Sequence, residues 1–161
     1  MAVADTVEAV VTRDLCTGCG ACESLAGDAL RMGLSPEGFM RPRRVGALSP
    51  ASARAILSVC TGRSLPPPPA ADAPVHRIFG RIVYMGRGHA ADPVLRFRGA
   101  TGGVLTALAV HLVESGRVEG VLQIATPSDD PMGSEPRFNT TREEILRASG
   151  SRYGPAAPLK V

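Results

Sequence analysis

Four cysteines are the residues of this sequence whose type and spacing could support metal chemistry. Cys16, Cys19 and Cys22 follow one another at intervals of two residues, and Cys60 lies well downstream. A 4Fe–4S cubane takes one thiolate per iron, so a Cys-x2-Cys-x2-Cys loop can bind three irons and a distant cysteine the fourth. The glycines between the first three cysteines give such a loop backbone freedom. The spacing predicts one 4Fe–4S cluster held by these four thiolates.

Other uses of the cysteines fit the pattern less well. A structural zinc site usually combines two separated ligand pairs, and His76, His89 and His111 form no such pair. Disulfides across two-residue spacings would be strained and are typical of secreted chains. In bacterial ferredoxins a fourth cysteine follows the third after three residues, where this chain has Ala26. Cys60 is therefore the expected fourth ligand.

Composition limits the class of protein. The chain has 161 residues, enough for one ordinary domain or two small ones, and its hydrophobic content of 44% is typical of a globular protein. The net charge is only +3, with no basic patch interleaved with aromatic residues, so nucleic-acid binding is not indicated. No signal peptide and no apolar run of the ~20 residues that span a bilayer are visible. We expect a cytoplasmic protein without a membrane span.

Elements around the cysteines should position them as ligands. A short helix over 6–14 leads into the cysteine loop, and a hairpin over 29–42 turns at Ser35-Pro36-Glu37-Gly38. Ser49 is expected to cap a helix that begins at Pro50 and ends at Cys60. The end of a helix would fix the direction of the Cys60 thiolate.

A proline-rich stretch over 65–75 is expected to be an extended linker. It divides the chain into an iron–sulfur module over 1–64, small and ferredoxin-like, and a module over 76–161 with a partial α/β sheet. In the second module the patterns predict a strand over 78–85, a helix over 104–115, a buried strand over 118–125, a weaker strand over 136–139, and a capped helix over 141–148. The fold class expected is α/β or α+β.

Thr101, Gly102 and Gly103 open the predicted helix over 104–115. Free backbone amides and the positive end of the helix dipole could hold a phosphate or the edge of a flavin there. The alternative is a tight turn that lets the helix pack closely. Several arginines surround the region, of which Arg98 is the candidate to clamp an anionic cofactor, and a solvated arginine-rich surface is the alternative.

Histidines and nucleophiles give no catalytic assignment. His111 is expected to be a packed or partly exposed residue of its helix, because no acid or nucleophile is placed beside it. His89, in a glycine-rich loop, is a slightly better candidate for a ligand contact. No arrangement of nucleophile and base indicates hydrolase chemistry.

Three stretches together resemble the N-terminal region of the coenzyme F420 hydrogenase/dehydrogenase β-subunit family. They are the cysteine loop over 16–22, the segments over 102–108 and 114–121, and the segment Thr141–Leu146 with Gly150-Ser151-Arg152-Tyr153. The resemblance implies an iron–sulfur flavoprotein that uses FAD and passes electrons between a partner subunit or ferredoxin-like donor and a deazaflavin or other organic acceptor. Family members continue past this region, which implies a truncated chain and a second half that could be separately encoded.

The function expected is therefore part of an oxidoreductase, relaying electrons between a 4Fe–4S cluster and a flavin. Two alternatives remain. One is a non-catalytic, ferredoxin-like electron-transfer module that docks on a partner and binds no flavin. The other is a degraded remnant whose sheet ends at an unpaired edge.

Overall fold

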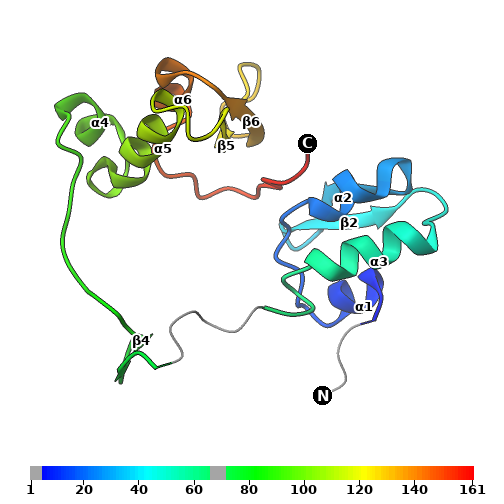
Figure 1. Ribbon diagram of the computed structural model, residues 1–161. Coiled ribbons are helices and arrows are strands. Elements are labelled where there is room, and N and C mark those ends of the chain that lie inside the picture. The colour runs from blue at the N-terminus through cyan, green and yellow to red at the C-terminus, as the bar shows by residue number, and fades with distance from the viewer. Residues whose placement is uncertain (1–4, 66–71) are drawn as a thin grey trace.

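The computed structural model describes residues 5–65 and 72–161, and it belongs to the α+β class (Figure 1). Short helices alternate with three two-stranded antiparallel sheets in this part of the chain. The predicted fold class is confirmed. No helix among the described residues has the length and apolarity required to cross a membrane.

The elements around the cysteines follow the predicted pattern closely. Helix α1 (Val7–Thr12) begins after Thr6, whose side chain accepts a hydrogen bond from the backbone N–H of Ala9. Strands β1 (Leu30–Leu34) and β2 (Met40–Arg44) form the expected hairpin. Helix α3 (Pro50–Val59) begins after the Ser49 cap and ends at Cys60. All of these predictions are confirmed.

A further helix, α2 (Ala21–Ala26), was not predicted, and it is followed by the short 3-10 turn η1 (Gly27–Ala29). It carries Cys22 and packs against α3 and β1. The core beneath it consists of Val7, Leu30 and Ile56. One small core therefore holds the helices and the hairpin of this half together.

The predicted strand over 78–85 is wrong. Only the two-residue strands β3 (Val75–His76) and β4 (Gly80–Arg81) form, and they pair with each other. Gly80 has φ +75°, so the chain turns in the middle of the expected strand. The apolar side chains of Val83 and Tyr84 are exposed, so no sheet or helix buries the alternating pattern. Residues 66–71 of the linker predicted over 65–75 lie outside the described residues.

The second half is built from α4 (Pro93–Arg98), η2 (Thr101–Gly103), α5 (Val104–Glu114), β5 (Val121–Ala125), β6 (Glu135–Asn139) and α6 (Arg142–Arg147). Strand β5 pairs with β6 in antiparallel fashion. Ile145 of α6 is completely buried against Leu95 and Val110. Thr141 and Glu144 form the predicted capping box of α6. Helix α4 was not predicted, whereas α5, β5, β6 and α6 were predicted from the sequence.

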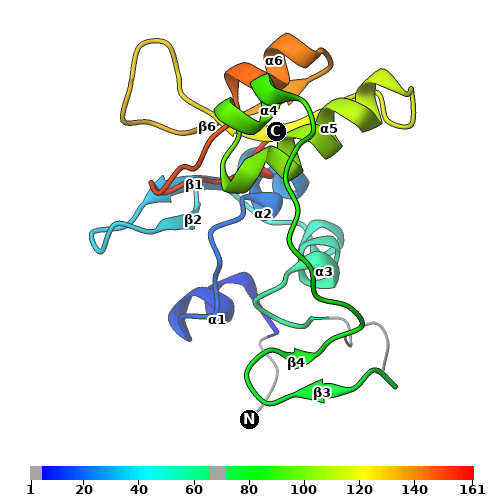
Figure 2. The same ribbon diagram turned by 90° about the vertical axis from the view of Figure 1, so that its left-hand side faces the viewer.

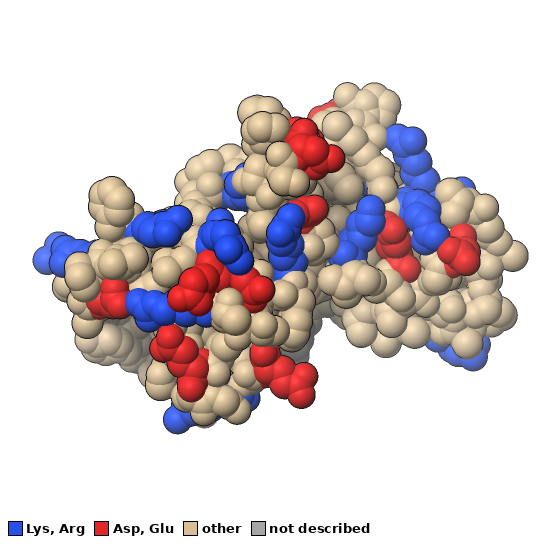
Figure 3. Space-filling view, turned by 90° about the horizontal axis from the view of Figure 1, so that it is seen from above, with Lys and Arg blue, Asp and Glu red and all other residues tan. Residues whose placement is uncertain are grey.

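Residues 149–161 follow α6 and form no regular helix or strand. Figures 1 and 2 show this last segment running from α6 back to the cysteine-bearing half, where it lies beside α2. Basic and acidic side chains are interspersed on the face shown in Figure 3. The chain thus returns at residue 161 to the part of the fold where it started.

Candidate metal and cofactor sites

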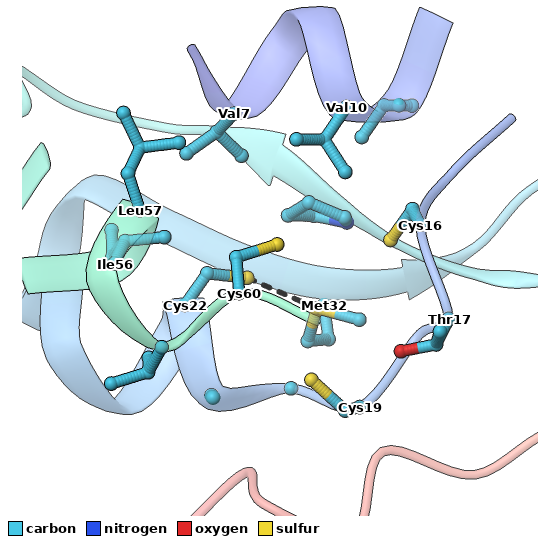
Figure 4. Close-up of a pocket in the computed structure, with 15 residues that line it drawn as sticks. Val7, Val10, Cys16, Thr17, Cys19, Cys22, Met32, Ile56, Leu57 and Cys60 are labelled. Atoms are coloured by element: carbon cyan, nitrogen blue, oxygen red, sulfur yellow. Dashed lines mark hydrogen bonds between the residues drawn. The ribbon is translucent and has the colours of Figure 1, made fainter. Parts of the chain in front are cut away.

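All four cysteines line one pocket between the cysteine loop, α2 and the end of α3 (Figure 4). Cys16 and Cys19 lie on the loop, Cys22 on α2, and Cys60 directly after α3. Each of the four is a free, half-buried cysteine. Residues far apart in the sequence are therefore brought to one site.

Two glycines allow close approaches around the cysteines, Gly62 between the segments of Cys60 and Cys16, and Gly18 between the cysteine loop and β2. A Cβ atom on Gly62 would lie 2.4 Å from the carbonyl oxygen of Leu15, which no side chain tolerates. Gly18 has φ +76°, and a Cβ atom there would lie 2.9 Å from the carbonyl oxygen of Met40. The hydroxyls of Thr17 and Thr61 also lie 3.5 Å apart, which links the loop of Cys16 to that of Cys60. Gly62 follows the end of α3, and its close contact with Leu15 explains why a glycine stands there.

Apolar side chains form the wall of the cysteine pocket, from α1, β1, β2 and α3: Val7, Val10, Val11, Met32, Pro42, Ile56, Leu57 and Val59. The thiol of Cys22 lies 3.8 Å from the sulfur of Met32. Burial first, and then the neighbouring Cys16 and Cys19, together raise the pKa of the Cys22 thiol to about 11. Binding of a metal group must therefore displace a proton held firmly at Cys22.

The donor set and its surroundings fit an iron–sulfur cluster. Four soft thiolates in an apolar shell are the ligands that such a cluster uses. Within the described chain, no group of three or more His, Cys, Asp or Glu side chains converges tightly enough to hold a single metal ion. A zinc ion would need its sulfur ligands at about 2.3 Å from one point. Four cysteine thiols at one pocket are the type of donor set that an iron–sulfur cluster requires.

A second, wider cavity of about 860 Å³ opens in the other half of the molecule. It lies between the start of α5, strand β5 and the segment that follows α6. Its lining is Gly86, Gly88, Ala100, Thr101, Val104, Leu105, Thr106, Ala109, Val121, Leu122, Gln123, Ile124, Ala148, Ser149, Gly150, Ser151 and Arg152. The size falls in the range of a cofactor site.

The four residues predicted to contact a flavin differ in whether they line this cavity. Thr101 lines it, whereas Gly102, Gly103 and Arg98 are not among its lining residues in the described chain. A Cβ atom on Gly103 would lie 2.3 Å from the carbonyl oxygen of Leu95, so this glycine lets η2 pack against α4. Gly102 accepts a hydrogen bond from the N–H of Ala90 through its carbonyl. A flavin role for these residues remains a prediction.

Several lining residues had no assigned role in the sequence. Ser149, Gly150, Ser151 and Arg152 border the cavity after α6. Gly150, Ser151 and Arg152 belong to one of the stretches that resemble the family, so the sequence did single them out. No periodicity or residue spacing in that stretch predicted a cavity. His111, by contrast, is exposed in the last turn of α5, and His89 is exposed in its loop.

The second half of the chain is similar to known proteins. Residues 85–161 match the family described as "Coenzyme F420 hydrogenase/dehydrogenase, beta subunit N-term". Coenzyme F420 hydrogenase subunit beta of Methanosarcina barkeri is 35% identical over 75 residues, which are 47% of this chain and 25% of the relative. The chain thus spans about a quarter of that relative's length.

A solved structure gives a further similarity. It is the F420-reducing [NiFe] hydrogenase complex of Methanosarcina barkeri, a chain of which is 35% identical and aligns with a TM-score of 0.37, covering 40% of this chain and 22% of its own. The family match begins at residue 85, so all four cysteines lie outside it.

Proposed function

We propose that this chain, whose residues 85–161 match the coenzyme F420 hydrogenase/dehydrogenase β-subunit family of oxidoreductase subunits, relays electrons between a 4Fe–4S cluster and a flavin. The observation that carries the proposal is the meeting of all four cysteines at one apolar pocket. The cluster is the part of the proposal that lies outside the family match.

Cys16, Cys19, Cys22 and Cys60 would hold the cluster, one thiolate for each iron. The apolar wall from α1 and α3 would limit access of water to it. In the other half, the 860 Å³ cavity would hold the flavin, which in this proposal is FAD. Arg152 and the hydroxyls of Thr101 and Ser151 are among the polar groups of the lining, which also include Thr106, Gln123 and Ser149, and they would hold phosphate or ring oxygens.

With both groups bound, the chain would couple the two-electron chemistry of a flavin to the one-electron transfer of a cluster. The name of the similar Methanosarcina protein supports coenzyme F420, a deazaflavin, as the organic acceptor and a hydrogenase-type subunit as the partner. Thiols that bind a cluster must stay reduced, which supports a cytoplasmic location. A ferredoxin-like donor would serve the same role as a partner subunit.

A second function is favoured by one observation. The cysteine-bearing half forms its own core of Val7, Leu30 and Ile56 and lies outside the family match. Such a unit would carry single electrons to a partner even without a bound flavin. This alternative is a ferredoxin-like electron-transfer module rather than an enzyme subunit.

A reductive titration distinguishes the two functions. The protein is reconstituted anaerobically with iron and sulfide, saturated with FAD, freed of unbound FAD and titrated with a reductant. The relay predicts uptake of about three electrons per chain, one by the cluster and two by the flavin. Uptake of one electron supports the electron-transfer module. Absence of iron, sulfide and visible absorbance in the reconstituted protein contradicts both.

A further inference from the structure

The last seven residues, 155–161, lie against the cysteine loop and α2, and we name them the C-terminal strap. The backbone N–H of Leu159 donates a hydrogen bond of 2.7 Å to the carbonyl of Cys19. The hydroxyl of Ser24 donates to the carbonyl of Leu159 at 2.6 Å and accepts from the N–H of Val161 at 3.1 Å. Three hydrogen bonds thus join the strap to the segment that carries Cys19 and Cys22.

The cysteine loop is shaped to receive the strap at Gly20. This residue has φ +89°, and a Cβ atom on it would lie 2.9 Å from the backbone nitrogen of Lys160 and 3.0 Å from the Cβ of Ala157. Ala157 is only 5% exposed, and its neighbours Ala156 and Pro158 are half-buried. Figure 4 shows the strap passing close to Cys19. The strap therefore packs closely on the loop at Gly20 through Ala157 and the backbone of Lys160, whereas the side chains of Leu159 and Val161 are exposed.

Charge joins the same elements. The carboxylate of Glu23, next to Cys22, accepts the backbone N–H of Met32 at 2.5 Å and has an 11% exposed side chain. Lys160 lies 3.8 Å from this carboxylate and Arg31 lies 4.0 Å from it. Lys160, the chain's only lysine, thus brings a cation to the helix that bears Cys22.

The strap continues directly from residues that border the wide cavity. Residues 148–152 line that cavity, and residues 155–161 cover the cysteine loop. A single segment of about a dozen residues therefore connects the two candidate cofactor sites without passing through the proline-rich stretch.

We infer that the C-terminal strap is a positioning element of the cluster site, which holds the Cys19–Cys22 segment in place and supplies a cation beside it. The inference rests on the proposed function for the identity of the bound cluster. Release of the cluster requires the cysteine loop to open, and the strap opposes that opening with hydrogen bonds and a buried alanine. Lys160 would stabilise the reduced, more negative state of the cluster and so raise its reduction potential.

A pair of matched serine variants tests the holding role. Ser24 lies two residues after Cys22 and Ser58 two residues before Cys60; both are exposed, and both are on helices of the same half. Ser24→Ala removes two bonds to the strap, whereas Ser58→Ala removes only a bond to the carbonyl of Ala55. With iron release to an excess of chelator as the readout, we expect roughly tenfold faster release for Ser24→Ala and no change for Ser58→Ala. Equal rates in the two variants would overturn the inference.

Hydrogen exchange tests the strap without any cluster. In the full-length, cluster-free protein the Leu159 amide should be protected, and Ser24→Ala should reduce that protection while Ser58→Ala does not. A Leu159 amide that exchanges freely in the unmodified protein would overturn the inference even if the protein binds four irons. Conversely, a protected Leu159 in a protein that never binds iron would refute the proposed function and leave the strap as a structural contact.

The reduction potential tests the role of the cation. Lys160→Met should lower the reduction potential of the reconstituted cluster relative to the unmodified protein. Lys160→Arg should leave the potential near its original value, because arginine keeps the positive charge. An unchanged potential in Lys160→Met would overturn the electrostatic part of the inference.

Discussion

Arg142 on α6 forms an ion pair with Asp92, which stands fifty residues earlier at the N-cap of α4. The Asp92 carboxylate also accepts the N–H groups of Val94 and Leu95 at 2.8 and 3.1 Å. Arg142 lies 3.6 Å from the carboxylate of Glu114 at the end of α5 as well. One guanidinium thus joins α4, α5 and α6 at the edge of the second core.

This arrangement predicts an acid-sensitive contribution of Asp92 to stability. The N–H of Leu95, and next the guanidinium of Arg142, hold the pKa of Asp92 below its ordinary value. A pKa that is lower in the folded than in the unfolded state contributes stability above about pH 4, and that stability is lost as the pH falls through the folded pKa. Thermal melts from pH 7 to pH 2.5 should therefore show a steeper loss of Tm for the unmodified protein than for Asp92→Asn.

Two variants at this position separate charge from capping. Asparagine caps a helix about as well as aspartate, so Asp92→Asn removes the ion pair and keeps the cap. Asp92→Ala removes both, and its Tm at pH 7 should lie below that of Asp92→Asn. If the melts of Asp92→Asn and the unmodified protein keep the same pH dependence, the carboxylate contributes nothing through its charge.

The buried side chain of Ile145 is expected to stabilise the second half more than any surface residue. Ile145 is 0% exposed and packs in the core with Leu95 and Val110. Ile145→Ala should lower the free energy of unfolding by about 2–5 kcal/mol, since it leaves a cavity. Leu105 on α5 is 80% exposed, and Leu105→Ala should change stability by less than about 0.5 kcal/mol. Urea unfolding followed by circular dichroism measures both, and equal effects would refute this packing.

The cysteine-bearing half was largely predictable from its sequence, because its signals are local. The Ser49-Pro50 pair sets the start of α3, and the turn at Ser35–Gly38 sets the hairpin. The approach of Cys60 to the other three cysteines was a prediction from ligand chemistry, and the structure brings all four to one pocket. Whether they bind a cluster stays a prediction.

Helix α2, the region over 78–85 and the strap depend on contacts between distant residues, which a local sequence pattern does not reveal. Asp92 and Pro93 do carry a helix-start signal for α4, but α2 begins after a left-handed glycine with no side-chain cap. The strand expected over 78–85 had the right alternation and no partner to bury it. The return of the strap to Gly20 joins residues 140 apart, and no spacing rule predicts such a contact.

Gly103 should be far less tolerant of a side chain than Gly116. Both have positive φ, +74° and +66°, but a Cβ atom on Gly103 would overlap the carbonyl of Leu95, whereas one on Gly116 meets open space. Gly116→Ala should cost about 1–2 kcal/mol for backbone strain alone. Gly103→Ala adds the steric overlap and should unfold the second half at a clearly lower urea concentration. A Gly103→Ala variant as stable as Gly116→Ala would contradict the close packing of η2 on α4.

Flavin affinity should depend on Arg152 rather than on Arg98. Arg152 lines the 860 Å³ cavity, and Arg98 is not among its lining residues in the described part of the chain. Arg152→Met should weaken FAD binding about tenfold, the effect of losing a charged hydrogen bond, and Arg98→Met should leave it unchanged. Quenching of FAD fluorescence gives both dissociation constants. Weaker binding only in Arg98→Met would favour the contact predicted from the sequence.

The central claim, a cluster held by all four cysteines, is tested most directly by counting iron and acid-labile sulfide per chain after anaerobic reconstitution of the unmodified protein and Cys60→Ser. We predict about four irons and four sulfides per unmodified chain, with absorbance near 400 nm that is bleached by reduction, and a clear loss of both in Cys60→Ser. An iron content that is the same with and without the Cys60 thiol, or a site that takes up one zinc ion and no sulfide, would contradict the account.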